Sequence, residues 1–288
     1  MLVCTLVLAT LLACDTEDRR RVPAEGSAQL GREAPLRVVS LSPVASRFVR
    51  AIGAETLLVG ADPASTDMLG RHELAVVDLL EAPRLAPDLV LTGEEQPSDA
   101  DALRVLRDAG SVVIEFAPHD LEEALDLSRE VGSWLVGEAA AVQFERAVAR
   151  PLAEVGGSSY GGPRPRVAAI VSINPLELAG GHSFETDLIE IAGGRSATHG
   201  GEAAQRALGP DGWRSIAPDL AIRFVATEPT KEDRHRLRAL VPESIPLTFF
   251  VFDRQYFWLE DPAEVARELR TLILSTGSRS EAALSGDG

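Results

Sequence analysis

The sequence has few cysteines, few basic residues and few aromatic residues. It contains 2 Cys in 288 residues, and both of them, Cys4 and Cys14, lie at the N-terminus. The body of the chain therefore has no disulfide, thiolate metal site or cysteine nucleophile. The 28 Lys+Arg are outnumbered by 44 Asp+Glu, which gives a formal net charge of -16. Because nucleic-acid binding depends on a cationic surface, we expect no nucleic-acid partner.

Sequence motifs for common enzymes are also missing. We find no G-x-S-x-G elbow, phosphate-binding P-loop or dinucleotide-binding glycine pattern. The acid-rich stretch 94–101 has nothing beside it that would position a nucleophile. His72, His119, His199 and His235 lack metal-site spacing, and no metal site or resident cofactor is expected. We therefore predict a binding protein and not an enzyme.

The N-terminal residues have the pattern of a targeting segment. Residues 1–13 are almost wholly apolar, too few for a membrane span of about 20 residues but suited to a signal-peptide core. The sequence Leu11-Leu12-Ala13-Cys14 resembles a bacterial lipobox, which predicts a signal peptide over 1–14 and lipidation of Cys14. Residues 15–35 are polar and rich in Gly and Pro, which predicts a flexible linker. The lipid would hold the protein on a membrane surface.

An internal repeat is the most informative feature. Three short motifs recur in the same order after almost the same interval. The matched segments are 39–43 with 171–175, 85–91 with 216–222, and 110–114 with 243–247. Three ordered matches of this kind indicate two similar lobes.

Each half has the pattern of an α/β lobe. Short β-branched runs at 37–41 and 167–173 end at a Ser-Pro or Asn-Pro turn, and a second strand follows a Pro-Asp pair in both halves. Strands that alternate with helical stretches predict a parallel-sheet α/β sandwich in each lobe. Loops at the carboxyl ends of such strands line ligand crevices.

A long helical connection is predicted between the lobes. Asp120 and Glu123 form a D-x-x-E capping pattern before a helix over 121–134, and a second helix runs over 138–154 with Pro151 as an expected kink. At about 1.5 Å per residue, the second helix would span about 25 Å as a strut between the lobes. The expected segments are an N-terminal lobe at 36–118, the connection at 119–160, a C-terminal lobe at 161–274 and a disordered tail at 275–288.

Several motifs together resemble a known family. The chain is similar over residues 36–274 to the helical-backbone (class III) periplasmic substrate-binding proteins of ABC importers, which serve cobalamin, ferric siderophores and haem. The similar motifs are 37–43, 51–54, 59–60, 86–91, 173–175, 180–184 and 187–194. The resemblance implies two α/β lobes joined by a backbone helix.

The resemblance also implies a function. The stretch 173–194 is most similar to cobalamin-binding members, which implies capture of cobalamin or a related corrinoid in the interlobe cleft and delivery to a permease dimer. The loop 61–67 lacks the aromatic residues usual in those members, so a ferric siderophore or haem is the alternative ligand. An envelope sensor or scaffold without transport is the alternative from another class. A lipid-anchored monomer on the periplasmic face of a membrane is expected.

Candidate ligand contacts come from the ends of predicted strands, from loops that lie in or beside the family-like motifs, and from the aromatic segment near the C-terminus. Flat aromatic rings suit a macrocycle, and a histidine could bind iron or a polar ligand group. A histidine or a strand-end Ser or Asn is also often only structural. The candidates are Ser42, Pro43, Asp62, Glu94, Asn174, His182, Phe184, Tyr256, Phe257 and Trp258.

The family docks on its permease through one acidic residue on each lobe. Asp211 matches the acid of the second lobe, and Asp99 or Asp101 matches that of the first. Ordinary surface acids are the alternative interpretation of these three residues.

Overall fold

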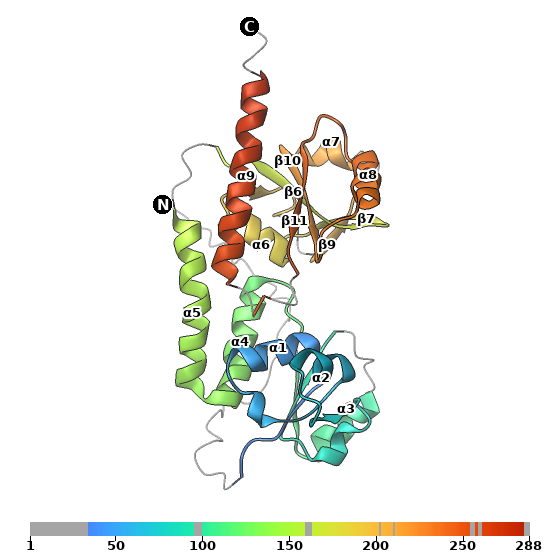
Figure 1. The fold of residues 1–288 in the computed structure, drawn as a ribbon, viewed down its shortest axis with the longest axis vertical. Coiled ribbons are helices and arrows are strands. Elements are labelled where there is room, and N and C mark those ends of the chain that lie inside the picture. The colour runs from blue at the N-terminus through green and yellow to red at the C-terminus, as the bar shows by residue number, and fades with distance from the viewer. Residues whose placement is uncertain are drawn as a thin grey trace, which may run out of the picture.

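The computed structural model describes residues 34–94, 100–158, 163–201, 203–209, 211–253, 257–258 and 261–284. The chain forms two lobes joined by helices (Figure 1). The two-lobed α/β fold predicted from the sequence is confirmed. The predicted signal peptide, Cys14 and almost all of the predicted linker lie outside the described residues.

The first lobe contains a five-stranded parallel sheet in the order β3-β2-β1-β4-β5. Each strand is a short, largely apolar run, and the two central strands β1 and β4 are fully buried. Helices follow β1, β2 and β4. The strands are β1 (Val38–Ser40), β2 (Leu58–Ala61), β3 (Ala75–Val76), β4 (Leu89–Thr92) and β5 (Val112–Glu115), and the α-helices are α1 (Pro43–Ala51), α2 (Pro63–Leu69) and α3 (Ala100–Asp108).

The second lobe contains a mixed sheet in the order β11-β10-β6-β7-β9, with β8 beside β6. Strands β8, β10 and β11 run parallel to their neighbours, whereas β7 and β9 pair in antiparallel fashion. The elements are β6 (Arg166–Ile173), β7 (Leu176–Ala179), α6 (Phe184–Ile191), β8 (Arg195–Ser196), β9 (Gln205–Ala207), α7 (Gly212–Ile216), β10 (Leu220–Val225), α8 (Lys231–Leu240) and β11 (Leu247–Val251). The sequence predicted a parallel sheet in this lobe, whereas the sheet is mixed.

The difference arises at Asn174-Pro175. In the first lobe the matching Ser42-Pro43 begins helix α1. In the second lobe the chain turns back through Asn174-Pro175, whose peptide bond is cis, and forms the β6–β7 hairpin. Similar sequences at the two strand ends thus lead to a helix in one lobe and a hairpin in the other.

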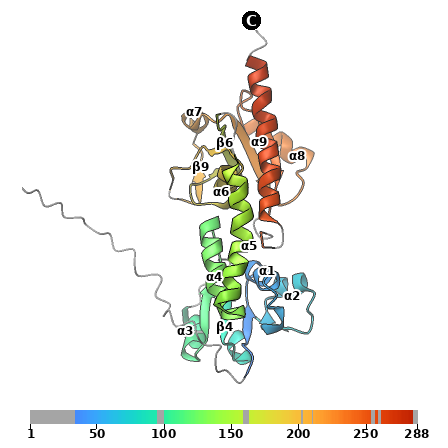
Figure 2. The same ribbon diagram turned by 90° about the vertical axis from the view of Figure 1, so that its left-hand side faces the viewer.

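Two long helices, α4 (Leu121–Val136) and α5 (Glu138–Gly157), lie between the lobes, and a third, α9 (Pro262–Leu284), lies along the second lobe (Figure 2). Helix α4 packs against α5, which also packs against α6 and against α9. The 20 residues of α5 span about 30 Å at 1.5 Å per residue, enough to pass from one lobe to the other. Pro151 lies inside α5 without ending it. One hydrophobic core continues from Phe48 in the first lobe to Leu188 in the second.

Two features of the helices differ from the sequence prediction. Asp120 caps α4 by accepting a hydrogen bond from the Glu123 amide, but the Glu123 carboxylate accepts its bond from the His119 amide instead of from Asp120. Helix α9 continues to Leu284, so most of the segment predicted as a disordered tail from 275 is helical.

None of the helices in the described ranges has the length and apolar character that a membrane crossing requires.

The second repeated motif has the same structure in both lobes. Ala86 and Ala217 end their short helices in the left-handed region, with φ of 42° and 38°. The carboxylate of Asp88 then accepts a hydrogen bond from the Arg37 amide at 2.9 Å, and that of Asp219 accepts one from the Arg166 amide at 2.7 Å. In both lobes the aspartate thereby ties together the starts of the two central strands.

We expect Asp88→Ala and Asp219→Ala each to lower the free energy of unfolding by about 1 kcal/mol, because each leaves one strand-end amide without its acceptor. Asp211→Ala is the control, since its side chain makes no capping hydrogen bond. Urea denaturation checks this. Equal stability of all three variants would contradict the anchoring role.

Candidate ligand-binding cleft

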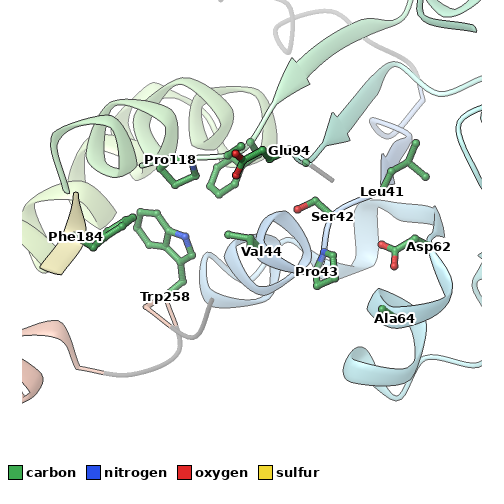
Figure 3. Close-up of a pocket in the computed structure, with 13 residues that line it drawn as sticks. Leu41, Ser42, Pro43, Val44, Asp62, Ala64, Glu94, Pro118, Phe184 and Trp258 are labelled. Atoms are coloured by element: carbon green, nitrogen blue, oxygen red, sulfur yellow. The ribbon is translucent and has the colours of Figure 1, made fainter. Parts of the chain in front are cut away.

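A cavity of about 200 Å³ lies where the lobes meet. Its walls come from loops at the carboxyl ends of the first-lobe strands, from the start of α6 and from the loop before α9 (Figure 3). The lining residues are Leu41, Ser42, Pro43, Val44, Asp62, Ala64, Gly93, Glu94, Phe116, Ala117, Pro118, Phe184 and Trp258. A cavity of this size holds part of a large ligand, because pockets for drug-sized ligands have volumes of about 300–1,000 Å³.

The floor of the cavity is the start of α1. Ser42 caps this helix by accepting a hydrogen bond from the Ala45 amide at 3.4 Å, and Pro43 occupies the first turn, where its fixed φ suits a helix. Gly93, at the end of the neighbouring strand β4, lies directly against Ser42. A side chain at position 93 would place its Cβ 2.9 Å from the Ser42 hydroxyl oxygen, so only glycine fits without displacing Ser42.

Asp62 stands at the start of α2 on the same side of the cavity. One carboxylate oxygen accepts a hydrogen bond from the Ser65 amide at 3.0 Å, and the other accepts one from the Ser65 hydroxyl. The side chain is buried and acts as the helix cap. Each oxygen of the Asp62 carboxylate therefore accepts one hydrogen bond within the protein.

Six aromatic rings form a continuous contact between the lobes, which we call the aromatic bridge. The Trp258 ring packs against four other rings, with centroid distances of 5.0–6.2 Å. They belong to Phe48 of α1, Phe116 after β5, Phe144 of α5 and Phe257. Phe257 continues the contact to Phe184 of the second lobe at 5.2 Å. The bridge consists of Phe48, Phe116, Phe144, Phe184, Phe257 and Trp258. It supports the two rings, Phe184 and Trp258, that close one end of the cavity.

Phe184 is positioned by a close backbone approach in the second lobe. A Cβ at Gly180 would lie 1.7 Å from the carbonyl oxygen of Ala203, and one at Gly181 would lie 1.8 Å from that of Gly201. The Gly180 carbonyl also accepts hydrogen bonds from the Ser183 and Thr186 hydroxyls. These contacts fix the N-terminus of α6.

A second cavity of about 230 Å³ lies on the side of the second lobe. It is lined by His119, Val171, Ser183, Glu185, Ala204, Gln205, Phe224, Ala226, Phe252 and Asp253. His119 and Ser183 directly adjoin residues of the first cavity in the chain. The two cavities are therefore neighbours along the junction of the lobes.

Hydrogen bonds also join the start of α4 to α6 at this junction. The Phe184 amide donates to the His119 carbonyl at 3.1 Å, and the Leu121 amide donates to the Asp187 carboxylate at 2.8 Å. The ring nitrogen Nδ1 of His182 lies 3.4 Å from the Asp120 carboxylate. Burial raises the pKa of Asp187 from 3.8 to about 6, and the nearby Asp120 carboxylate adds to the increase.

This raised pKa predicts a pH-dependent stability. The folded protein binds a proton on Asp187 more tightly than the unfolded chain does, so the stabilisation is complete below about pH 4 and is lost as the pH rises through about 6. Asp187→Asn keeps a side-chain oxygen that can accept the hydrogen bond from the Leu121 amide, but the asparagine side chain does not titrate in this pH range. Urea denaturation across this pH range should show a smaller fall in stability for Asp187→Asn than for the wild type. Identical pH profiles would contradict this account.

The structure brings together six of the ten residues predicted to contact a ligand. The residues that line the first cavity are Ser42, Pro43, Asp62, Glu94, Phe184 and Trp258. The other four lie elsewhere or outside the described residues. Phe257 is only 2% exposed, because it packs between Phe184 and Trp258. Tyr256 lies outside the described residues.

Two predicted contacts line neither cavity. Asn174 is exposed in the turn that follows β6 and lines neither cavity. His182 has a side chain 63% exposed, beside Asp120, and lines neither cavity. Within the described part of the chain, no group of three or more His, Cys, Asp or Glu residues is arranged to bind a metal.

The described candidate docking acids lie on the surface. The Asp101 side chain is 88% exposed at the start of α3, and that of Asp211 is 90% exposed before α7. Figures 1 and 2 both show α3 and α7 on the same side of the molecule, one on each lobe. Asp99 lies outside the described residues.

Sequence reasoning missed several cavity residues, above all Phe116, Ala117 and Pro118. They follow β5 directly, so the rule that ligand crevices lie at the carboxyl ends of parallel strands could have identified them. Phe48 and Phe144 carry no such local signal, because their role depends on rings from distant parts of the chain.

Comparison with known proteins shows similarity in structure only. No protein-family model matches the chain, and no curated protein matches it significantly in sequence. A periplasmic haem-binding protein of Vibrio cholerae has 16% sequence identity, covers 83% of this chain and 99% of its own, and gives a TM-score of 0.66. The periplasmic vitamin B12-binding protein of the same organism has 13% identity, covers 85% and 97%, and gives 0.60.

A possible iron-binding periplasmic solute-binding protein of Staphylococcus epidermidis has 19% identity, covers 82% of this chain and 97% of its own, and gives a TM-score of 0.65. The similarity extends over most of each chain and includes both lobes. This chain therefore has the fold of the helical-backbone periplasmic binding proteins.

Proposed function

We propose that this protein is the extracytoplasmic solute-binding component of an ABC importer. It captures a large ligand between its lobes and delivers it to a membrane permease. The observation that carries the proposal is the cavity at the junction of the lobes, with aromatic rings at one end and polar groups along its sides. Structural neighbours that are named as periplasmic binding proteins for haem, iron or vitamin B12 support it.

Cobalamin or a related corrinoid is the first choice of ligand. The motifs at 173–194 favour it, and Phe184 and Trp258 offer flat surfaces against which a macrocycle can pack. Haem or a ferric siderophore is the second choice, since two of the three structural neighbours described above are named for haem or iron binding.

The proposal is tested by titrating the full chain, purified in mild detergent, with cyanocobalamin, haemin and a ferric siderophore. Tryptophan fluorescence reports on the binding because Trp258 lines the cavity. We expect one of the three to bind with a dissociation constant below about 1 μM. No binding of any of them at concentrations on the order of 50 μM would contradict the proposal.

Asp101 and Asp211 are proposed to contact the permease. Reversing either charge should leave ligand affinity unchanged, because both side chains are exposed and neither lines the cavity. Ligand uptake by cells should fall several-fold in Asp101→Arg and Asp211→Arg, because rim charges steer association. Asp126→Arg, on α4, is the matched control. Normal uptake by both docking variants would exclude this role.

A further inference from the structure

The start of α4 and the start of α6 meet where the two cavities adjoin (Figures 1 and 2). Pro118, just before the cap of α4, lines the first cavity, and His119 lines the second. On the other side, Phe184 at the start of α6 lines the first cavity, and Ser183 before it lines the second. The contacts between the two helix starts therefore hold walls of both cavities together.

The two helices rest on different lobes. A Cβ at Gly132 of α4 would lie 3.0 Å from the Ile52 side chain, directly after α1, so α4 packs closely on the first lobe. Helix α6 packs against β6 and β8 of the second lobe. A separation of the helix starts would thus move a part of one lobe away from a helix that rests on the other.

Two backbone amides donate hydrogen bonds across this junction. The Phe184 amide bonds to the His119 carbonyl at 3.1 Å, and the Leu121 amide bonds to the Asp187 carboxylate at 2.8 Å. Amides in such contacts exchange with solvent when the local structure opens. The exchange of these two amides therefore measures how often the junction opens.

Asp187 places its carboxylate where negative charge is already concentrated. Asp120 caps α4, and Glu122 follows in the first turn of that helix. Burial is the main cause of the raised pKa of Asp187, and the charges of Asp120 and Glu122 add to it, whereas the Leu121 amide and His182 oppose it. The charges with the largest effects come from the start of α4 and from His182, and none of them from α5, α9, β6 or β8, which also pack against α6.

Opening the junction would expose Asp187 to water, where its pKa returns toward the ordinary value of 3.8. The closed junction thus binds a proton more tightly than the open one does. The preference for the closed form is complete below about pH 4 and is lost as the pH rises through about 6. Asp187 is only half-buried, so solvent screens part of this effect, and we expect the open form to become about three- to tenfold more populated between about pH 5 and pH 7.5.

We propose that Asp187 makes the α4–α6 junction a latch between the cavity walls, firm in acidic surroundings and looser at neutral pH. A protonated carboxyl group still accepts a hydrogen bond from the Leu121 amide through its carbonyl oxygen, and it no longer sets a negative charge against Asp120. Ionisation restores that repulsion in a partly buried place. The latch belongs to the fold of the chain, so the proposal stands without the proposed function.

NMR-detected amide hydrogen exchange of the full chain without ligand tests the latch. After correction for intrinsic exchange rates, the protection of the Leu121 and Phe184 amides should fall about three- to tenfold from about pH 5 to pH 7.5. The Arg37 and Arg166 amides, which bond to carboxylates at the strand starts of the two lobes, should change by less than about twofold. These two amides separate a local opening from global unfolding.

Asp187→Asn should abolish the pH dependence at the junction, so that the protection of both junction amides stays within about twofold over the same range. The asparagine oxygen can still accept from the Leu121 amide, and the side chain carries no charge at either pH. Asp126→Asn is the matched control, because Asp126 is an exposed carboxylate on α4. It should show the same fall in protection as the wild type.

Three outcomes would overturn the proposal. The junction amides of the wild type are equally protected at both pH values, Asp187→Asn loses protection as the wild type does, or the Arg37 and Arg166 amides lose protection by the same factor as the junction amides. The last outcome would show that the whole chain unfolds and that no latch opens. None of the three bears on ligand binding, which the titrations test separately.

Discussion

Replacing Trp258 with alanine is expected to lower the free energy of unfolding by about 3–5 kcal/mol and to remove ligand binding. The ring is buried and contacts Phe48 of the first lobe, Phe144 of α5 and Phe257, so its removal opens a void where the lobes and the connecting helix meet. It also removes one end of the cavity. Urea denaturation and ligand titration measure the two effects.

Trp258→Phe is the conservative variant at this position. Phenylalanine keeps an aromatic ring but fills less space, so we expect a smaller loss of stability and of ligand affinity than in Trp258→Ala. Trp213→Phe is the control for the loss of an indole, because its N–H bonds to the Leu240 carbonyl far from the cavity. If Trp258→Ala is as stable as the wild type, the aromatic bridge does not hold the lobes together.

Gly181→Ala is expected to have the largest effect on folding. The added methyl group would lie 1.8 Å from the Gly201 carbonyl oxygen, and backbone, unlike the end of a long side chain, has little freedom to move away. We expect a loss of at least about 4 kcal/mol in the free energy of unfolding, or no folded protein. Gly180→Ala should behave similarly, because its methyl group meets the Ala203 carbonyl at 1.7 Å.

Gly200→Ala is the matched control for these variants. Position 200 lies close by in the same lobe, a Cβ there meets nothing within 4 Å, and its φ is not in the left-handed region. Its stability should stay within about 0.5 kcal/mol of the wild type, as is usual at exposed sites. Thermal unfolding with circular dichroism compares the three variants. A Gly181→Ala protein as stable as Gly200→Ala would show that the backbone contact is not tight.

Local patterns in the sequence predicted the strand-and-helix framework well. The repeated Ala-Pro-Asp motif predicted two similar lobes correctly, because it has the same structural role in both. Asp88 and Asp219 each accept a hydrogen bond from the amide at the start of a neighbouring strand. The end of β1 was also predictable as part of the cleft, since Ser42-Pro43 is a helix start that follows a buried strand.

Features that depend on distant contacts were not predictable in the same way. Asn174-Pro175 looks like Ser42-Pro43 in sequence, yet its hairpin depends on β7 pairing between β6 and β9. The aromatic bridge likewise joins Phe48, Phe144 and Trp258 from three separate regions, and no spacing rule relates them. The residues at strand ends and helix starts could therefore be predicted from local sequence, whereas the aromatic contacts depend on tertiary packing.

Hydrogen–deuterium exchange of the full chain, with and without saturating cyanocobalamin, tests most directly whether the junction of the lobes captures the ligand. We predict slower exchange at 41–46, 62–66, 93–94 and 116–121 and at the start of α6 near Phe184, because these segments line or adjoin the cavities. Exchange in α8 should not change. Protection confined to α8 or to other surfaces away from the cavities, or no protection at all, would contradict the account.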